Sequence, residues 1–321
     1  MYANELNKVT NNYANNNGRH NKNTCHCAKC KRVLLPMEGT AFVGGYNGGG
    51  YICSSCDSTI SYHGGRDSKV GTTKKHGWII SPELECNSCS EGVERYLISL
   101  GFNNEMDCTV YREFTGKMFE GSKGLSTILK RLDTEYSNGN FDTTRPNVGT
   151  HLNISRKDEN GNNLISKYAN ILDNYSNSLR VGLSDYLYNN ANVCRYFFGR
   201  DMFGDWAKRV TDCTYTTEHA VYLNFQHLHE GNASRLEWRL AKYNSGVENG
   251  GKEAYFRTID TCKKLTEIIL KACEDIQKIE SVEGRTESNK AKRMNVCKKA
   301  TDKMIKYLEK EYSKRNVETI A

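Results

Sequence analysis

Two acids separated by one residue lie in the stretch from Gly77 to Glu85, which reads GWIISPELE. Alternate side chains of a strand point to opposite faces, so Glu83 and Glu85 would share one face while Leu84 lies on the other. Like charges side by side on a half-buried face are unfavourable unless a cation lies between them. The pair is therefore a candidate metal site. The alternative is an edge strand, which Pro82 would permit, with both acids facing solvent.

Three later stretches carry polar residues at the same alternating spacing. Glu113 lies in DCTVYREF, and His151 and Asn153 alternate with aliphatic residues in VGTHLNIS. Glu237 and Arg239 share one face of RLEWRL. A lone histidine on such a face is more often a structural residue than a ligand, so its significance depends on the acids around it.

Two further arginines, Arg195 and Arg200, lie among aromatic residues in RYFFGR. Arginines in such surroundings usually have an anionic partner. Oxygen ligands with one imidazole suit Mg2+ or Mn2+, and arginines beside such ligands suit nucleotide phosphates. The residue types therefore indicate a divalent-metal site that handles phosphate.

In chain order, the motifs E-L-E, D-x-x-V-x-x-E, G-T-H-L-N-I, F-G-R and L-E-W-R resemble those of the amidoligase family. This family belongs to the glutamine-synthetase-like superfamily of carboxylate-amine ligases. The resemblance covers about residues 77 to 243. It implies an α+β fold in which a curved antiparallel sheet, a half-barrel, holds ATP and divalent ions between acids on its strands.

The resemblance also implies roles for individual residues. Ligands of the metal nearest the accepting carboxylate would be Glu85 and Glu113. Ligands of the ion that bridges the ATP phosphates would be Glu83, His151 and Glu237. The side chains that neutralise the transferred phosphoryl group would be Arg195, Arg200 and Arg239. Contacts with the nucleotide would come from His151, Asn153, Arg200 and Arg239.

The implied reaction passes the γ-phosphoryl group of ATP to a small-molecule or peptide carboxylate, and an amine then attacks the acyl phosphate to form an amide. Asp107 would orient or deprotonate the amine. The chain departs from the family pattern at two positions. Pro82 replaces the usual glycine before the first glutamate, and Asn153 replaces the second histidine of G-x-H-x-H.

Two cysteine knuckles precede these motifs. Cys27 and Cys30 form one C-x2-C pair, and Cys53 and Cys56 form a second. This spacing is typical of four thiolates that bind one structural zinc ion, with Cys25 or His26 as substitute ligands. The sequence predicts a zinc-ribbon-like module whose folding depends on the metal.

The chain has 321 residues, a net charge of +7 and 13 cysteines. No apolar run reaches membrane-spanning length, and the N-terminus lacks the hydrophobic core of a signal peptide, so a cytoplasmic protein with reduced thiols is expected. Lysines and arginines are spread along the chain, which is weak evidence for a nucleic-acid partner. Few prolines and many asparagines are typical of AT-rich genomes and suggest a phage origin.

The predicted organisation has four parts. Residues 1–23 are expected to be a disordered tail, 24–66 the zinc module, 77–243 the catalytic domain and 253–315 a helical pair packed on it. Within the catalytic domain, Ser90 is expected to cap a helix that ends at Gly101, and a longer helix to run from about Leu183 to Trp206. A hairpin is expected to join residues 220–225 to 235–241.

Two other functions are consistent with the sequence. One is a catalytically inactive, zinc-containing scaffold that binds nucleic acid or a protein complex, and the other is a structural or assembly protein built on the C-terminal helices. Acids on strand faces favour the enzyme, because no packing rule requires them there.

Overall fold

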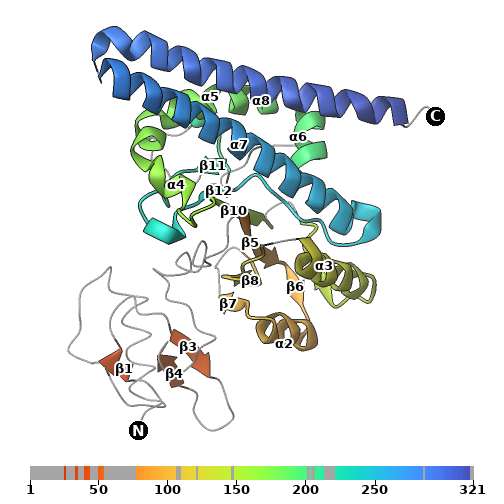
Figure 1. The fold of residues 1–321 in the computed structure, drawn as a ribbon. Coiled ribbons are helices and arrows are strands. Elements are labelled where there is room, and N and C mark those ends of the chain that lie inside the picture. Colours follow the sequence, from red (N-terminus) through yellow and green to blue (C-terminus); the bar gives the residue numbers. More distant parts are fainter. Residues whose placement is uncertain are drawn as a thin grey trace.

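The computed structural model describes residues 77–318 except 106–109, 121, 146–147, 201–202, 204–206, 213–220 and 285, together with four short strands between residues 25 and 53. The described residues form seven α-helices and a six-stranded antiparallel sheet, which confirms an α+β fold (Figure 1).

The N-terminal strands form two small antiparallel pairs. β1 (Cys25–His26) pairs with β2 (Val33–Leu34), and β3 (Thr40–Val43) pairs with β4 (Gly50–Cys53). The expected tail and three of the four expected zinc ligands, Cys27, Cys30 and Cys56, lie outside the described residues. The zinc module and the tail therefore stay predictions.

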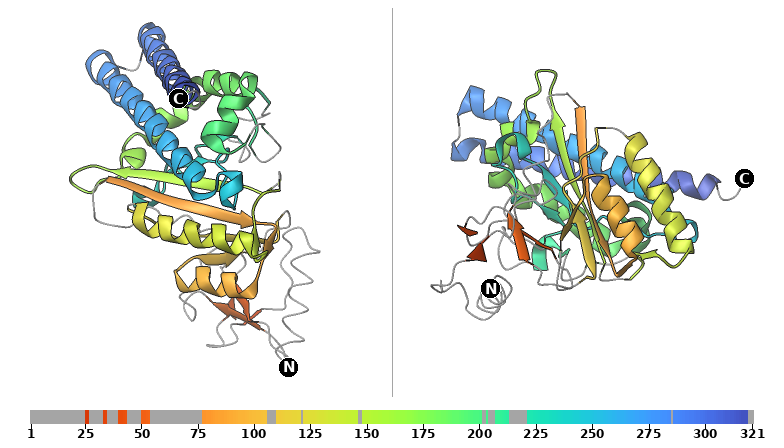
Figure 2. Two further views of the ribbon diagram at one scale, coloured as in Figure 1. Left: turned by 90° about the vertical axis from the view of Figure 1, so that its right-hand side faces the viewer. Right: turned by 90° about the horizontal axis from the view of Figure 1, so that it is seen from below.

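The main sheet is antiparallel throughout, and its two longest strands lie side by side at its centre (Figure 2). In spatial order its strands are β11 (Leu223–Asn224), β12 (Leu236–Trp238), β10 (Thr150–Lys157), β5 (Gly77–Cys86), β8 (Arg112–Thr115) and β7 (Asn103–Glu105). Beside it, β6 (Ser88–Cys89) pairs with β9 (Phe141–Asp142). The predicted hairpin is confirmed, because β11 pairs with β12.

The helices vary from one turn to more than eight turns. They are α2 (Glu91–Ser99), α3 (Ser122–Ser137), α4 (Leu164–Lys167), α5 (Ala169–Asn189), α6 (Ala191–Phe198), α7 (Gly251–Glu283) and α8 (Lys290–Glu318). Four short 3-10 turns are η1 (Val210–Asp212), η2 (Gly231–Ala233), η3 (Val247–Asn249) and η4 (Glu287–Asn289). The cap predicted for α2 is confirmed, because the Ser90 side chain accepts a hydrogen bond from the N–H of Val93.

The sheet has one apolar face and one polar face. Leu84, Leu152 and Trp238 are fully buried on the apolar face. Trp238 Nε1 donates a hydrogen bond to Thr266 Oγ1 of α7 (3.2 Å), and its ring stacks on Phe198 of α6. Helices α6 and α7 therefore pack on the apolar face and leave the other face to the polar side chains.

The prediction of a single helix from about Leu183 to Trp206 is wrong, because α6 ends before Gly199. Gly199 has a φ of 75°, and a Cβ there would lie 2.5 Å from the backbone oxygen of Lys242. Only glycine fits this left-handed turn. The next residue, Arg200, is buried, so the helix end determines where an arginine enters the interior.

Candidate metal centre on the polar face of the sheet

The strand registers place the predicted acids and the histidine on one face of the sheet. His151 of β10 lies opposite Glu83 of β5, and Glu113 of β8 lies opposite Glu85. Glu237 of β12 lies opposite Asn153, two residues after His151, so it shares their face. All of these side chains are buried. Residues from four strands thus meet on one surface because antiparallel register and alternation act together.

The same face extends to the outer strands. Glu105 of β7 lies opposite Glu113, and Asn224 of β11 lies opposite Glu237. Asn224 Nδ2 donates to Glu237 Oε2 (2.7 Å), and Thr115 Oγ1 donates to Glu105 Oε1 (2.9 Å). Neither residue is predicted from the sequence, because each belongs to a strand of only two or three residues, too short for alternation to be recognised.

One group on this face is centred on the imidazole of His151. Its Nδ1 lies 3.3 Å from Glu83 Oε2 and 3.3 Å from Glu237 Oε1, and its Nε2 lies 3.6 Å from Glu85 Oε1. One ligand atom each from Glu83, His151 and Glu237 lie within 4.8 Å of one another. Three carboxylates therefore surround a single ring.

The electrostatics of this group follow from burial and crowding. Burial and Arg239 both act to lower the pKa of His151, but Glu85, Glu237 and Glu83 outweigh them and raise it to about 9. Burial acts to raise the pKa of Glu237, but Arg239 and then His151 hold it well below its usual range. Before any ion binds, a protonated imidazole therefore balances the acids.

A divalent ion fits this donor set. Mg2+ binds its ligands octahedrally at ~2.1 Å. Two neighbouring ligand atoms around it are therefore ~3 Å apart. The two 3.3 Å separations around His151 are close to that value. Two carboxylates and one neutral imidazole also match the ligands that Mg2+ and Mn2+ accept.

Two arginines border the acids from separate parts of the chain. Arg239 NH1 donates to Glu237 Oε1 (2.6 Å), and Arg200 NH2 donates to the backbone oxygen of Val148 (3.1 Å). Burial lowers the pKa of Arg200 to about 10 although Glu85 opposes this change. Arg200 thus remains charged at neutral pH and adds positive potential where Glu85 lies.

Gly149 lies where these groups meet. A Cβ at this position would approach Arg200 NH2 to 2.6 Å, and both Glu85 Oε2 and His151 Nε2 to 3.1 Å. The N–H of Gly149 donates to Glu85 Oε2 (2.5 Å). A side chain at residue 149 would thus require the Arg200 guanidinium to move away from the acids.

Pro82 lies in β5, an inner strand, so the edge-strand alternative for the two acids is wrong. The N–H of Ile80 points toward the β8 side of β5, where it donates to Phe119 O. Alternate N–H groups of a strand point the same way, so an N–H at position 82 would also point toward β8. Pairing between β5 and β8 begins only at Leu84. Pro82 thus occupies a gap in the ladder and costs the sheet no hydrogen bond.

Asn153 forms hydrogen bonds to a carboxylate and to a guanidinium group. Its Nδ2 donates to Glu83 Oε1 (2.8 Å), and its Oδ1 accepts from Nε of Arg235 (2.9 Å). Arg235 is fully buried. It begins the R-L-E-W-R segment but was not among the site residues predicted from the sequence. The R-x-E spacing was the available signal, since residues two apart on a strand share a face.

The roles predicted for two other residues stay predictions. Arg195 is exposed on α6, in contrast to buried Arg200. Asp107 lies outside the described residues.

Asp133 of α3 shows how a buried acid is explained by structure alone. It accepts hydrogen bonds from Tyr243 Oη (2.6 Å) and from the backbone N–H groups of Gly246 (2.9 Å) and Lys252 (2.9 Å). It therefore fixes the start of α7. The acids on the sheet face differ from Asp133, because several of them lie beside one another and beside His151.

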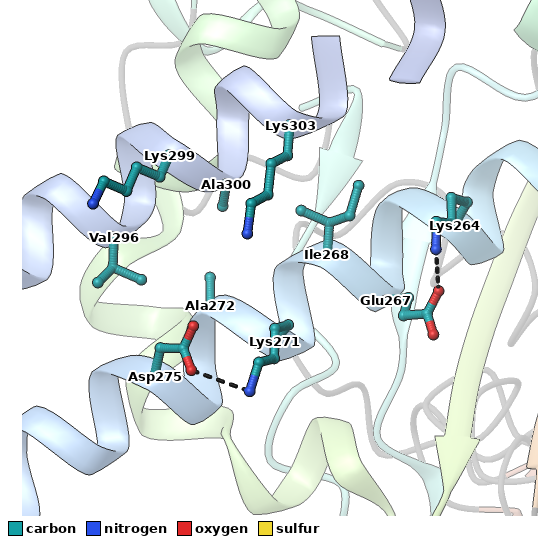
Figure 3. A pocket seen from close by; sticks show the side chains of 10 residues that line it. All are labelled: Lys264, Glu267, Ile268, Lys271, Ala272, Asp275, Val296, Lys299, Ala300 and Lys303. Carbon is teal, nitrogen blue, oxygen red and sulfur yellow. Dashed lines mark hydrogen bonds and ion pairs between the residues drawn. The ribbon is translucent and has the colours of Figure 1, made fainter. Parts of the chain in front are cut away.

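A groove of about 430 Å³ lies elsewhere, between α7 and α8 (Figure 3). Lys264 pairs with Glu267 (2.8 Å) and Lys271 with Asp275 (3.2 Å) along its α7 side. These pairs join neighbours on the solvent-facing side of α7, and no buried acid lines the groove. The groove thus lacks the convergent polar groups of a catalytic site.

No protein-family model matches this chain, and no curated protein matches it. Among the helices of the described residues, none combines the length and the apolar character that crossing a membrane requires.

Proposed function

We propose that this chain is an ATP-dependent carboxylate-amine ligase that resembles the amidoligases and forms an amide through an acyl phosphate. The proposal rests on one observation, the convergence of five buried glutamates and a histidine from five strands on one face of an antiparallel sheet. Burying so many acids costs stability unless cations bind among them. A metal and phosphate site provides the reason to keep them.

In the proposed mechanism, Glu83, His151 and Glu237 would hold the ion that serves the ATP phosphates. Glu85 and Glu113 would hold the ion nearest the accepting carboxylate, and Glu105 extends that row of acids. Divalent ions held there would supply positive charge for the phosphate oxygens. His151 must lose its proton before its nitrogen can serve as a ligand.

The arginines would act on the transferred phosphoryl group. Arg239 and Arg200 are preorganised by Glu237 and by the backbone oxygen of Val148, so they need little reorganisation when charge develops. The acceptor carboxylate attacks the γ-phosphorus, the bond to the ADP oxygen breaks, and an acyl phosphate forms. The amine then attacks the acyl carbon and releases phosphate, with Asp107 as the group that orients it or takes its proton.

The finer architecture belongs to the same proposal. We assign the six-stranded sheet to the half-barrel of the amidoligases, α7 and α8 to the C-terminal helical pair, and Cys27, Cys30, Cys53 and Cys56 to a zinc ribbon. Purified protein should then contain one zinc ion per chain, and Cys53→Ser should release it. Metal analysis of both proteins tests this assignment.

A screen for ADP release tests the ligase directly. Full-length protein with Mg2+ and ATP is offered pools of carboxylates and amines, and ADP release should require both substrates. Mg-ATP alone should raise the melting temperature, since a ligand at 100 times its Kd adds about 2.7 kcal/mol. A melting temperature that stays constant up to millimolar Mg-ATP would contradict the ligase and favour the scaffold.

The second candidate, an inactive scaffold with an anionic partner, is favoured by α8. This helix carries ten Lys or Arg residues and four Asp or Glu residues, a net charge of +6 against +7 for the whole chain. The excess of basic residues is thus concentrated in α8, in contrast to the even spread expected from the sequence. Binding of nucleic acid that weakens steeply with salt, without ADP release, would support this candidate.

A further inference from the structure

The polar face is connected to the β11–β12 turn by a closed loop of polar contacts that no metal-ligand motif predicts. The members of this loop, in order, are Glu83, Asn153, Arg235, Glu230, His227, Glu237 and His151. Arg235 NH1 donates to Glu230 Oε2 (2.6 Å), and Glu230 Oε1 lies 2.9 Å from His227 Nδ1. His227 Nε2 lies 3.7 Å from Glu237 Oε2, which is an ion-pair distance. The remaining contacts are those of Asn153 and His151 described above.

Asn153 has the chemistry that this loop requires. Its amide donates to one charged group, Glu83, and accepts from another of opposite sign, Arg235. A side-chain amide carries a donor and an acceptor at every pH, so both hydrogen bonds are independent of protonation state. The departure from the G-x-H-x-H pattern is thus a connection between a candidate ligand and the turn.

The turn itself is held independently of the loop. The N–H of Arg235 donates to His227 O (3.0 Å), and Asn163 Nδ2 donates to Ser234 O (2.7 Å). Asn163 also caps α4, since its Oδ1 accepts from the N–H of Ile165 (2.8 Å). Removing the His227 ring should therefore leave the backbone of the turn in place.

The loop extends from the buried acids to the surface. The side chain of Arg235 is 1% exposed, that of His227 15% and that of Glu230 34%. Burial acts to raise the pKa of Glu230, but His227 and Arg235 together hold it below its usual value. A charged Glu230 thus connects Arg235 and His227, each of which contacts a residue of the polar face.

We propose that His227 and Glu230 are positioning residues, which fix the carboxylates of Glu237 and Glu83 from outside the set of candidate ligands. Glu237 is contacted directly by His227, and Glu83 through Arg235 and Asn153. The consequence for ion affinity rests on the proposed function, whereas the connectivity of the loop does not. Residues that orient metal ligands in this manner typically change metal affinity 10–100-fold.

The first test measures coupling without any added divalent ion. His227→Ala and Asn153→Ala should each lower the melting temperature of the full chain by about 2–6 °C. The double variant should lower it by clearly less than the sum, because either change alone opens the loop. Additive shifts, or no shift in either variant, would overturn the proposal.

The second test measures Mn2+ affinity by titration. His227→Ala should weaken binding 10–100-fold. His229→Ala, the matched control, should leave it within about 2-fold, because His229 is exposed and pairs with Asp173 outside the loop. His227→Gln, which keeps a donor, should recover much of the affinity and replaces the alanine variant if that variant does not fold. Equal Mn2+ affinity in His227→Ala and wild type would overturn the positioning role.

The two tests separate the inference from the proposed function. Wild-type protein that binds no Mn2+ would contradict the metal site, and the thermal coupling would still decide whether the loop exists. Wild-type binding with additive thermal shifts would support the metal site and overturn the loop.

Discussion

The polar face of the sheet and the α7–α8 groove both gather charged side chains, but they do so in different ways. In the groove, charges pair with neighbours three or four residues away on the solvent-facing side of α7, such as Lys271 with Asp275 (3.2 Å). On the sheet, Glu83 and His151 meet although they are 68 positions apart, and both are buried. Exposed local pairs contribute only about 0.3–0.5 kcal/mol. Charges gathered by long-range contacts and desolvated are costly, so they indicate a function.

The largest difference between the two regions should appear when one acid is removed from each. Glu85→Gln should abolish ADP release, because a neutral amide is a poor ligand for a hard cation. Its melting temperature should fall only modestly, since the amide keeps an oxygen for the N–H of Gly149 and one charge leaves a crowded group of carboxylates. Activity and thermal unfolding are measured together, with Asp275→Asn in the groove as the control that changes neither. An active Glu85→Gln variant would contradict the proposed metal site.

The pH dependence of stability should come next in size. The pKa of His151 is raised from 6.5 to about 9 in the fold, so its contribution to stability is fully present below pH 6.5 and disappears as the pH rises through 9. Protein without divalent ions should thus lose about 3 kcal/mol between these values. Urea unfolding at several pH values measures this loss. His151→Asn should remove the dependence, and an unchanged slope in that variant would assign it to other groups.

Removing an arginine tests catalysis more than binding. Arg239→Ala should lower kcat by ~10²-fold, because a preorganised charge near the transferred phosphoryl group is lost. Lys264→Ala in the α7–α8 groove serves as the control and should leave kcat unchanged. Steady-state kinetics separate kcat from KM. A change confined to KM would assign Arg239 to ground-state binding.

A smaller change in stability is expected from a substitution that only adds a methyl group. Gly149→Ala should destabilise the fold by about 1–3 kcal/mol, because its Cβ would lie 2.6 Å from Arg200 NH2 and the buried guanidinium has to move. Gly92→Ala in α2 is the control. Its Cβ would meet nothing closer than 3.9 Å, so it should stabilise the protein by about 0.5–1 kcal/mol. Urea unfolding compares the two, and equal effects would show that Gly149 is not confined.

The smallest effect should be that of an exposed pair. Lys278 pairs with Glu274 (2.7 Å) on the surface of α7. Lys278→Ala should change the free energy of unfolding by no more than about 0.5 kcal/mol, and less at high salt. A loss of 2 kcal/mol or more would show that charge pairs on α7 matter for the fold, and the contrast between the two regions would disappear.

The sequence by itself determined the features that depend on local geometry. Alternation along a strand is fixed by the backbone, so Glu83 with Glu85, and His151 with Asn153, had to share a face wherever the strand lay. The cap at Ser90 is equally local, because a side chain satisfies an N–H three residues ahead. The hairpin of β11 and β12 also joins segments that are close in the chain.

Only the tertiary structure decided which strands are neighbours and in what register. Glu105 and Asn224 join the polar face because their short strands pair with β8 and β12. Arg200 is buried because the chain leaves α6 through a left-handed turn at Gly199, whereas Arg195 is exposed on the helix itself. His227 reaches Glu237 across a turn whose shape depends on Asn163, 64 positions earlier. Such contacts depend on packing between distant segments, which no local spacing encodes.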